Sequence, residues 1–276
     1  MTESADTRIV RSGDVELHVT DRGSGPAVLL LHGFPDSRRM WDGVRDELVA
    51  SGHRVIIFDQ RGFGESSAPA GRRRYAFDDL VADAATVVAD ASIEGPLTVA
   101  GHDWGALVSW GLCLARPELV ARHVAVSVGH PTSYRKAGAA QKARGWYVGS
   151  FQLVGLAEWA YSRRDFAGLR WLLDRHPDQD GFVRDFSRPG RFTAGLNWYR
   201  RNLAAIFTRR WADCRVPTLG VWSSGDKYLV EQQMTGSQQR MQAEWEYVRI
   251  DGAGHWVPME QPRRVAELIA GWAAKA

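Results

Sequence analysis

Three side chains that can carry out nucleophilic catalysis each follow a short apolar run of the sequence. Asp103 stands in the segment GHDWG, Asp226 in SSGD and His255 in GAGHW. Because sheets of parallel strands gather functional side chains at the carboxyl ends of the strands, we expect the three to meet. An aspartate nucleophile, a histidine base and an acid that orients the histidine can together form and hydrolyse an ester.

The segment around Asp103 has the pattern G-x-D-x-G, in which glycines stand on both sides of the acid. Glycines permit a sharp turn from a strand into a helix, and such a turn pushes its central side chain into a cleft. The amino terminus of the following helix favours a negative charge there. Taken alone, this aspartate would more often be a plain helix cap, but the segments that hold Asp226 and His255 favour a nucleophile.

A second loop is expected to lie beside this turn. The segment HGFP, residues 32–35, follows another apolar run, and we expect the backbone N–H groups of Phe34 and Trp104 to form an oxyanion hole. Pro35 has no N–H group to contribute. The glycine-rich segment DQRGFGES, residues 59–66, lacks the phosphate-loop and dinucleotide patterns, so we interpret it as structural.

The elements that position these loops are short apolar runs that alternate with helical patterns. A continuous apolar run is typical of a strand that is buried on both faces of a parallel sheet. The alternation predicts an α/β fold, with a mostly parallel sheet flanked by helices. The strands are expected at residues 28–31, 55–58, 97–100, 124–128 and 219–222, with a further strand-like run at 245–250, helices at 78–91 and 106–115, and an antiparallel edge hairpin formed by residues 9–11 and 15–20.

The strand runs stop after Pro131 and resume near Val216. The residues between them have helical patterns and hold 15 of the 29 aromatic residues of the chain. We interpret residues 131–215 as a helical cap inserted into a core made of residues 1–130 and 216–276. Most of its aromatic side chains are expected to fill the core of the cap itself.

Composition and charge exclude several classes of protein. The chain has 276 residues, 45% of them apolar, and carries 35 basic against 32 acidic residues, so it is neither disordered nor fibrous. Its arginines stand in short groups near acidic residues, so nucleic acid is not an expected partner. Cys113 and Cys214 match no metal-ligand spacing. We expect a cytoplasmic monomer or homodimer that needs neither cofactor nor metal and is not bound to a membrane.

Taken together, HGFP, DQRGFGES, GHDWGA, SSGD and GHWVPMEQP resemble the α/β-hydrolases of the epoxide hydrolase and haloalkane dehalogenase branch. The resemblance extends from about residue 28 to the carboxyl terminus. The order nucleophile, acid, histidine is that of the catalytic triad of this fold. The resemblance thus implies that Asp103 is the nucleophile, Asp226 the orienting acid and His255 the general base.

The opening of an epoxide creates an alkoxide, which needs a proton donor, and a phenol with a pKa of about 10 can serve. The epoxide hydrolases that this chain resembles carry two cap tyrosines for this purpose. The segment NWYR matches the one that bears the first of them, which implies Tyr199. The second precedes a Phe-Gln pair by four residues, and Tyr147 has this relation to residues 151–152. Tyr134 and Tyr161 remain alternatives for the second donor.

These features predict an epoxide hydrolase that acts on apolar epoxides, with Phe34, Trp104 and Trp198 in contact with the substrate. The first alternative is a haloalkane dehalogenase with the same nucleophile. It would use the N–H of Trp104 to bind halide, but the HGFP loop has phenylalanine where such enzymes usually have asparagine. The second alternative is a non-catalytic small-molecule receptor of the same fold, although such a protein would be expected to lack a catalytic residue.

Overall fold

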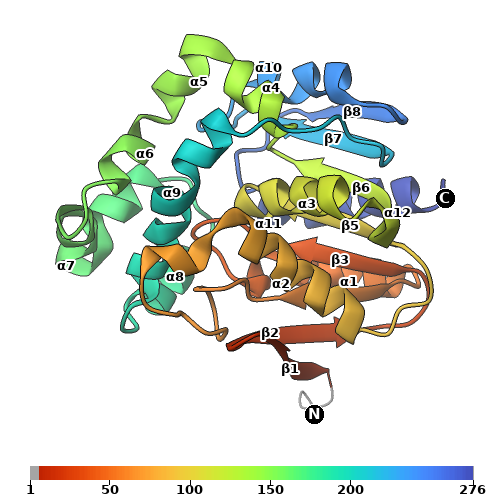
Figure 1. Cartoon of the computed structure of the whole chain (residues 1–276), viewed down its shortest axis with the longest axis horizontal. Coiled ribbons are helices and arrows are strands. Elements are labelled where there is room, and N and C mark those ends of the chain that lie inside the picture. The colour runs from red at the N-terminus through yellow and green to blue at the C-terminus, as the bar shows by residue number, and fades with distance from the viewer. Residues whose placement is uncertain (1–5, 276) are drawn as a thin grey trace.

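The computed structural model describes residues 6–275, and within them the apolar runs pair into one sheet of eight strands. The spatial order is β1-β2-β4-β3-β5-β6-β7-β8 (Figure 1). β2 is antiparallel to β1 and β4, and all other neighbours are parallel. The α/β class and the edge hairpin are therefore confirmed. The strands are β1 Thr7–Ser12, β2 Val15–Arg22, β3 Ala27–Leu31, β4 Arg54–Phe58, β5 Leu97–His102, β6 Val120–Val126, β7 Thr218–Ser223 and β8 Trp245–Ile250.

Alternate side chains of each central strand enter two separate apolar cores. In β3, Val28 and Leu30 belong to one core and Leu29 and Leu31 to the other. Helices α1 (Asp42–Ala50) and α12 (Pro262–Ala273) cover the first core, and α2 (Phe77–Asp90) and α3 (Trp104–Ala115) cover the second. Burial on both faces explains why these strands read as continuous apolar runs.

Six helices lie between β6 and β7 in the described part of the chain. In Figure 1 helices α5 to α9, drawn in green and teal, gather to one side of the sheet, in agreement with the predicted cap. Where the cap begins and ends stays an interpretation, because α4 packs against α10 and η4 of the core. The helices are α4 Pro131–Lys136, α5 Gly138–Arg144, α6 Trp146–Phe151, α7 Leu156–Leu172, α8 Gln179–Phe186, α9 Arg191–Thr208, α10 Glu231–Thr235 and α11 Val257–Glu260, with 3-10 helices η1 Arg38–Trp41, η2 Arg72–Tyr75, η3 Pro117–Leu119 and η4 Gly236–Arg240.

Most predicted boundaries differ from the structure by one or two residues, and two of these differences lie close to Asp103. Strand β6 ends at Val126, two residues before the expected end, because Ser127 has a φ of 70° and leaves the extended conformation. Helix α3 begins at Trp104, two residues earlier than expected, and so it starts directly after Asp103. Among the helices of residues 6–275, none combines the length and apolar composition that a bilayer crossing requires.

Helix α3 packs very closely on the carboxyl end of β3. A Cβ atom on Gly105 would overlap the carbonyl groups of Leu31 and His32, and one on Gly101 would overlap the backbone of Gly105. Only glycine fits at these two positions, because the overlapping atoms are backbone and cannot move aside. The two glycines of G-x-D-x-G thus allow the turn and also bring it against the neighbouring loop.

We expect Gly105→Ala to destabilise the protein by about 1–3 kcal/mol, the usual cost of an added methyl group in a packed site. The matched control is Gly271→Ala in α12, where an added Cβ has nothing within 4 Å. That change should be neutral or should stabilise by up to about 1 kcal/mol, because alanine favours the helix. Urea unfolding followed by circular dichroism measures both. Equal stabilities of the two variants would contradict the close-contact explanation.

Candidate active site

Asp103 occupies the sharp turn between β5 and α3. Its φ of 54° and ψ of −121° lie outside the regions that a residue with a side chain prefers. The carbonyl of Asp103 accepts the N–H groups of Ala106 and Leu107 at 3.0 and 3.1 Å, so its backbone already belongs to the helix while its side chain projects from the turn. The side chain is 17% exposed. The predicted strained turn is therefore present, and its carboxylate faces a cleft.

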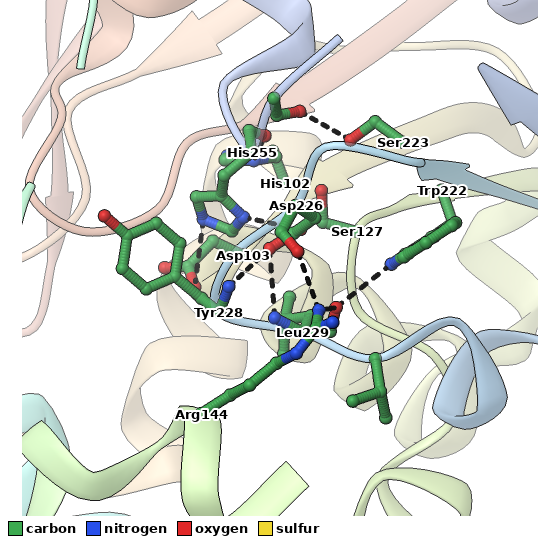
Figure 2. A network of polar contacts seen from close by, with 12 residues as sticks. His102, Asp103, Ser127, Arg144, Trp222, Ser223, Asp226, Tyr228, Leu229 and His255 are labelled. Atoms are coloured by element: carbon green, nitrogen blue, oxygen red, sulfur yellow. Dashed lines mark hydrogen bonds and ion pairs between the residues drawn. The ribbon is translucent and has the colours of Figure 1, made fainter. Parts of the chain in front are cut away.

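His255 lies against two carboxylates that come from different loops (Figure 2). Its Nδ1 is 2.8 Å from Oδ2 of Asp226, and its Nε2 is 3.9 Å from Oδ2 of Asp103. The other oxygen of Asp226 accepts the N–H groups of Tyr228 and Leu229 at 2.8 and 2.9 Å, which fixes this carboxylate in place. A carboxylate at Nδ1 keeps the proton on that nitrogen and leaves the lone pair of Nε2 directed toward Asp103.

Burial and the neighbouring groups shift the pKa values of His255 and Asp103 in opposite directions. Burial lowers the pKa of His255, but the charge and hydrogen bond of Asp226, together with the charges of Asp103 and Asp36, outweigh it, and the pKa is raised above its usual value of 6.5. Burial raises the pKa of the Asp103 carboxyl, and His255 together with the N–H groups of Phe34 and Trp104 opposes that rise. The site therefore holds a basic imidazole beside a carboxylate that the backbone helps to stabilise.

The loop HGFP reaches Asp103 as expected. The N–H group of Phe34 donates to Oδ1 of Asp103 at 2.9 Å, and the N–H of Trp104 also stabilises this carboxylate. Gly33 permits the approach, since a Cβ there would be 2.5 Å from both Cβ and Oδ1 of Asp103. The phenyl ring of Phe34 is buried and packs edge-on against Tyr199, with ring centroids 5.3 Å apart. Two backbone donors thus face the carboxyl group of Asp103.

A narrow, mostly apolar cavity of about 50 Å³ lies above Asp103, between the core and the inserted helices. Trp104 lines it, as predicted. Phe34 and Trp198 do not: both are buried, and the indole N–H of Trp198 donates to the carbonyl of Arg61 at 2.9 Å, so their positions give no support to the predicted substrate contacts. The lining residues are Asp103, Trp104, Leu107, Val128, Tyr134, Gln141, Gly145, Tyr147, Val148, Tyr199, Leu203, Ile206, Phe207, Tyr228 and Leu229.

The tyrosine hydroxyls differ sharply in their hydrogen bonding. Those of Tyr161 and Tyr228 are bonded within the protein, to the hydroxyl of Ser150 at 2.7 Å and the carbonyl of Leu172 at 2.9 Å. Three hydroxyls of the seven donate no hydrogen bond to any residue in the range 6–275, and all three tyrosines line the cavity with Asp103: Tyr134, Tyr147 and Tyr199. Both predicted donors therefore face the cavity, and of the two alternatives only Tyr134 does.

Further polar residues form hydrogen bonds to the backbone around His255 and Asp226. Nε2 of His102 is 2.8 Å from the carbonyl oxygen of His255, and the centroids of the two rings lie 4.6 Å apart, so His102 holds the backbone of His255 in place. Arg144 donates to the carbonyls of Asp226 and Leu229 at 2.7 and 2.6 Å (Figure 2). Sequence reasoning missed Arg144, because no local pattern marks a contact between residues 82 positions apart. Within residues 6–275 no group of three or more His, Cys, Asp or Glu side chains is arranged to hold a metal ion.

Comparison with known proteins agrees with this geometry. A family model described as the alpha/beta hydrolase fold matches residues 26–262. The chain belongs to the α/β-hydrolase fold family. This α/β-hydrolase is 31% identical to epoxide hydrolase A of Mycobacterium tuberculosis over 95% of each chain, which places it in the epoxide hydrolase branch. It is also 30% identical to the AB hydrolase superfamily protein YfhM of Bacillus subtilis, over 95% of this chain and 96% of that protein. The crystal structure of epoxide hydrolase VrEH1 from Vigna radiata superposes with a TM-score of 0.85, at 27% identity over 98% of both chains.

The contribution of Asp226 to the pKa of His255 can be measured directly. In Asp226→Asn the charge that raises the pKa of His255 is gone while burial remains, so the pKa of His255 should fall below its wild-type value. An NMR titration of labelled histidine follows this. His123 is an internal control, because burial lowers its pKa to about 3 and it should stay neutral in both proteins. An unchanged titration of His255 would mean that Asp226 does not govern its charge.

Proposed function

We propose that this α/β-hydrolase converts an epoxide into a vicinal diol, without a cofactor, through an ester formed on Asp103. One observation carries the proposal: the carboxylate of Asp103 lines the same cavity as Tyr147 and Tyr199, whose hydroxyls donate no hydrogen bond within residues 6–275. The carboxylate can attack a ring carbon while the phenols bind the ring oxygen from the opposite side. The relatives named epoxide hydrolases support the same reaction.

In the first step, an oxygen of Asp103 bonds to an epoxide carbon, and the bond from that carbon to the ring oxygen breaks. The alkoxide that forms takes a proton from Tyr147 or Tyr199. Burial raises the pKa of both phenols well above 10, so they are fully protonated at neutral pH and ready to donate. The rings lie on α6 and α9, with centroids 6.5 Å apart, close enough to share one oxygen.

In the second step, His255 removes a proton from water, and the resulting hydroxide attacks the ester carbonyl carbon of Asp103. The carbonyl oxygen becomes an oxyanion, which the N–H groups of Phe34 and Trp104 stabilise. Asp226 stabilises the imidazolium that forms. The tetrahedral intermediate then collapses, and the alkoxide that leaves takes the proton of the new carboxyl group, so the diol departs with the oxygen that Asp103 contributed and the carboxylate keeps one oxygen from water. The imidazolium returns its proton through water to the tyrosinate left by the first step, which restores both groups.

The apolar part of the cavity wall, formed by side chains such as Leu107, Val128 and Ile206, supports an epoxide with an apolar substituent. A dehalogenase also forms an ester on its aspartate, but a halide leaves without a proton. Tyr147 and Tyr199 would then have no role as proton donors. A receptor would need no imidazole aligned with a carboxylate. The cytoplasmic location and the state as monomer or homodimer stay predictions.

Isotope labelling tests whether the reaction passes through an ester on Asp103. With enzyme in excess over styrene oxide in ¹⁸O-labelled water, the first diol should contain no label, because its new oxygen comes from Asp103. The label should instead appear in the carboxylate of Asp103. Mass spectrometry of the diol and of the peptide that contains Asp103 measures both. Labelled diol in the first turnover would mean that water attacks the epoxide directly.

Removal of both phenols should abolish ring opening. We expect Tyr147→Phe combined with Tyr199→Phe to lower kcat for epoxides by about 10²–10⁴, the usual contribution of a positioned acid. Tyr161→Phe is the matched control, since its hydroxyl is bonded to Ser150, and its kcat should stay near the wild-type value. Steady-state hydrolysis of styrene oxide measures all three proteins. Substantial activity in the double variant would show that the donors lie elsewhere.

A further inference from the structure

The cavity holds one phenol more than the proposed reaction uses. An epoxide oxygen has two lone pairs and accepts two hydrogen bonds, which Tyr147 and Tyr199 can supply. Tyr134 lines the same cavity, and its hydroxyl donates to no residue in the range 6–275. An epoxide that carries only hydrocarbon would shield this hydroxyl from water without giving it an acceptor, which is unfavourable.

Tyr134 lies on a different helix from the two proposed proton donors of the cavity. It lies on α4, which packs against α10 of the core, whereas Tyr147 and Tyr199 lie on α6 and α9. Tyr134 also lines a second cavity of about 160 Å³, which Tyr147 and Tyr199 do not line. The two cavities share the following wall residues: Tyr134, Gln141, Gly145, Val148, Leu203 and Phe207. Tyr134 therefore stands where the cavity above Asp103 adjoins the second one.

We propose that Tyr134 donates a hydrogen bond to a second oxygen of the substrate, so that the preferred substrates are epoxides with an ether, hydroxyl or carbonyl oxygen close to the ring. This inference rests on the proposed epoxide hydrolase function. With the ring between Asp103 and the two cap phenols, a substituent that extends toward the second cavity passes Tyr134. The apolar walls at Val148, Leu203 and Phe207 then hold the rest of the substituent.

The protonation and surroundings of the Tyr134 hydroxyl allow it to donate a hydrogen bond to a ligand. Burial raises the pKa of its phenol to about 12, the charge of Asp103 acts in the same direction, and the Gln141 amide opposes them. The hydroxyl is therefore protonated at neutral pH. Gln141 itself is held in place, because it donates to the carbonyl of Tyr228 at 2.9 Å and accepts the N–H of Val230 at 3.0 Å. The neighbour of Tyr134 is thus engaged with the backbone, and the phenol proton is left for a ligand.

A matched pair of substrates tests the inference. Butyl glycidyl ether and 1,2-epoxyoctane have the same number of heavy atoms and differ by one ether oxygen in place of a methylene near the ring. The ratio of their kcat/KM values is compared between wild type and Tyr134→Phe, so that any difference in intrinsic reactivity cancels. The variant should lose the preference for the ether by about tenfold, the effect of one hydrogen bond, mainly through KM, while epoxyoctane should react at least as well as with wild type, because it no longer covers an unpaired hydroxyl.

Two controls separate the possible outcomes. Tyr161→Phe should leave the ratio unchanged, and in wild type an isomeric ether with its oxygen farther from the ring should lose the advantage, a result that needs no variant. An unchanged ratio in Tyr134→Phe, or an equal loss on both substrates, would overturn the inference while the proposed function stands. If wild type hydrolysed neither epoxide, the proposed function would fail and the inference with it.

Discussion

The active site depends on one close contact between two loops of the core. Gly105 lies directly on the carbonyl of Leu31, and Gly33 lies directly on the side chain of Asp103, with no room for a Cβ at either position. This contact brings the N–H of Phe34 within 2.9 Å of the Asp103 carboxylate. The glycines therefore do more than allow a turn: they set the distance between the nucleophile and a group that stabilises its oxyanion.

Asp103 also lies close enough to His255 for its charge to affect the pKa of the imidazole. The charge of Asp103 contributes to the raised pKa of His255, together with Asp226. In the proposed reaction Asp103 loses its charge when the ester forms, so one cause of the raised pKa disappears at that stage. The imidazole then releases its proton more easily, at the stage when a neutral base is needed. The order of the two steps is thus favoured by the charges themselves, without movement of the chain.

The parts of the fold that are local in sequence could be predicted, and those that depend on distant contacts could not. Continuous apolar runs indicated buried parallel strands, and Asp226 and His255 could be located because the sheet brings its strand ends together. The cap gave less information, because its helices pack through contacts between residues far apart in sequence. For that reason local patterns revealed neither the contact of Trp198 with the carbonyl of Arg61 nor the contacts of Arg144 with the carbonyls of Asp226 and Leu229. Tyr134 remained one of two alternatives until hydrogen bonding separated it from Tyr161.

The cap and the core contribute different chemistry, and a partly buried ion pair connects the helices of the cap. Arg200, next to Tyr199 on α9, donates to the carbonyl of Phe151 at the end of α6 and to both oxygens of Glu158 on α7. Although burial opposes it, the guanidinium lowers the pKa of Glu158 to about 2. The pair therefore stays charged at neutral pH and joins α9 to α7, and the hydrogen bond from Arg200 to Phe151 joins α9 to α6, the helix that bears Tyr147. Because one arginine links the helices of both phenols, the spacing of the two proton donors is set within the cap, while the glycine contacts set the position of Asp103 within the core.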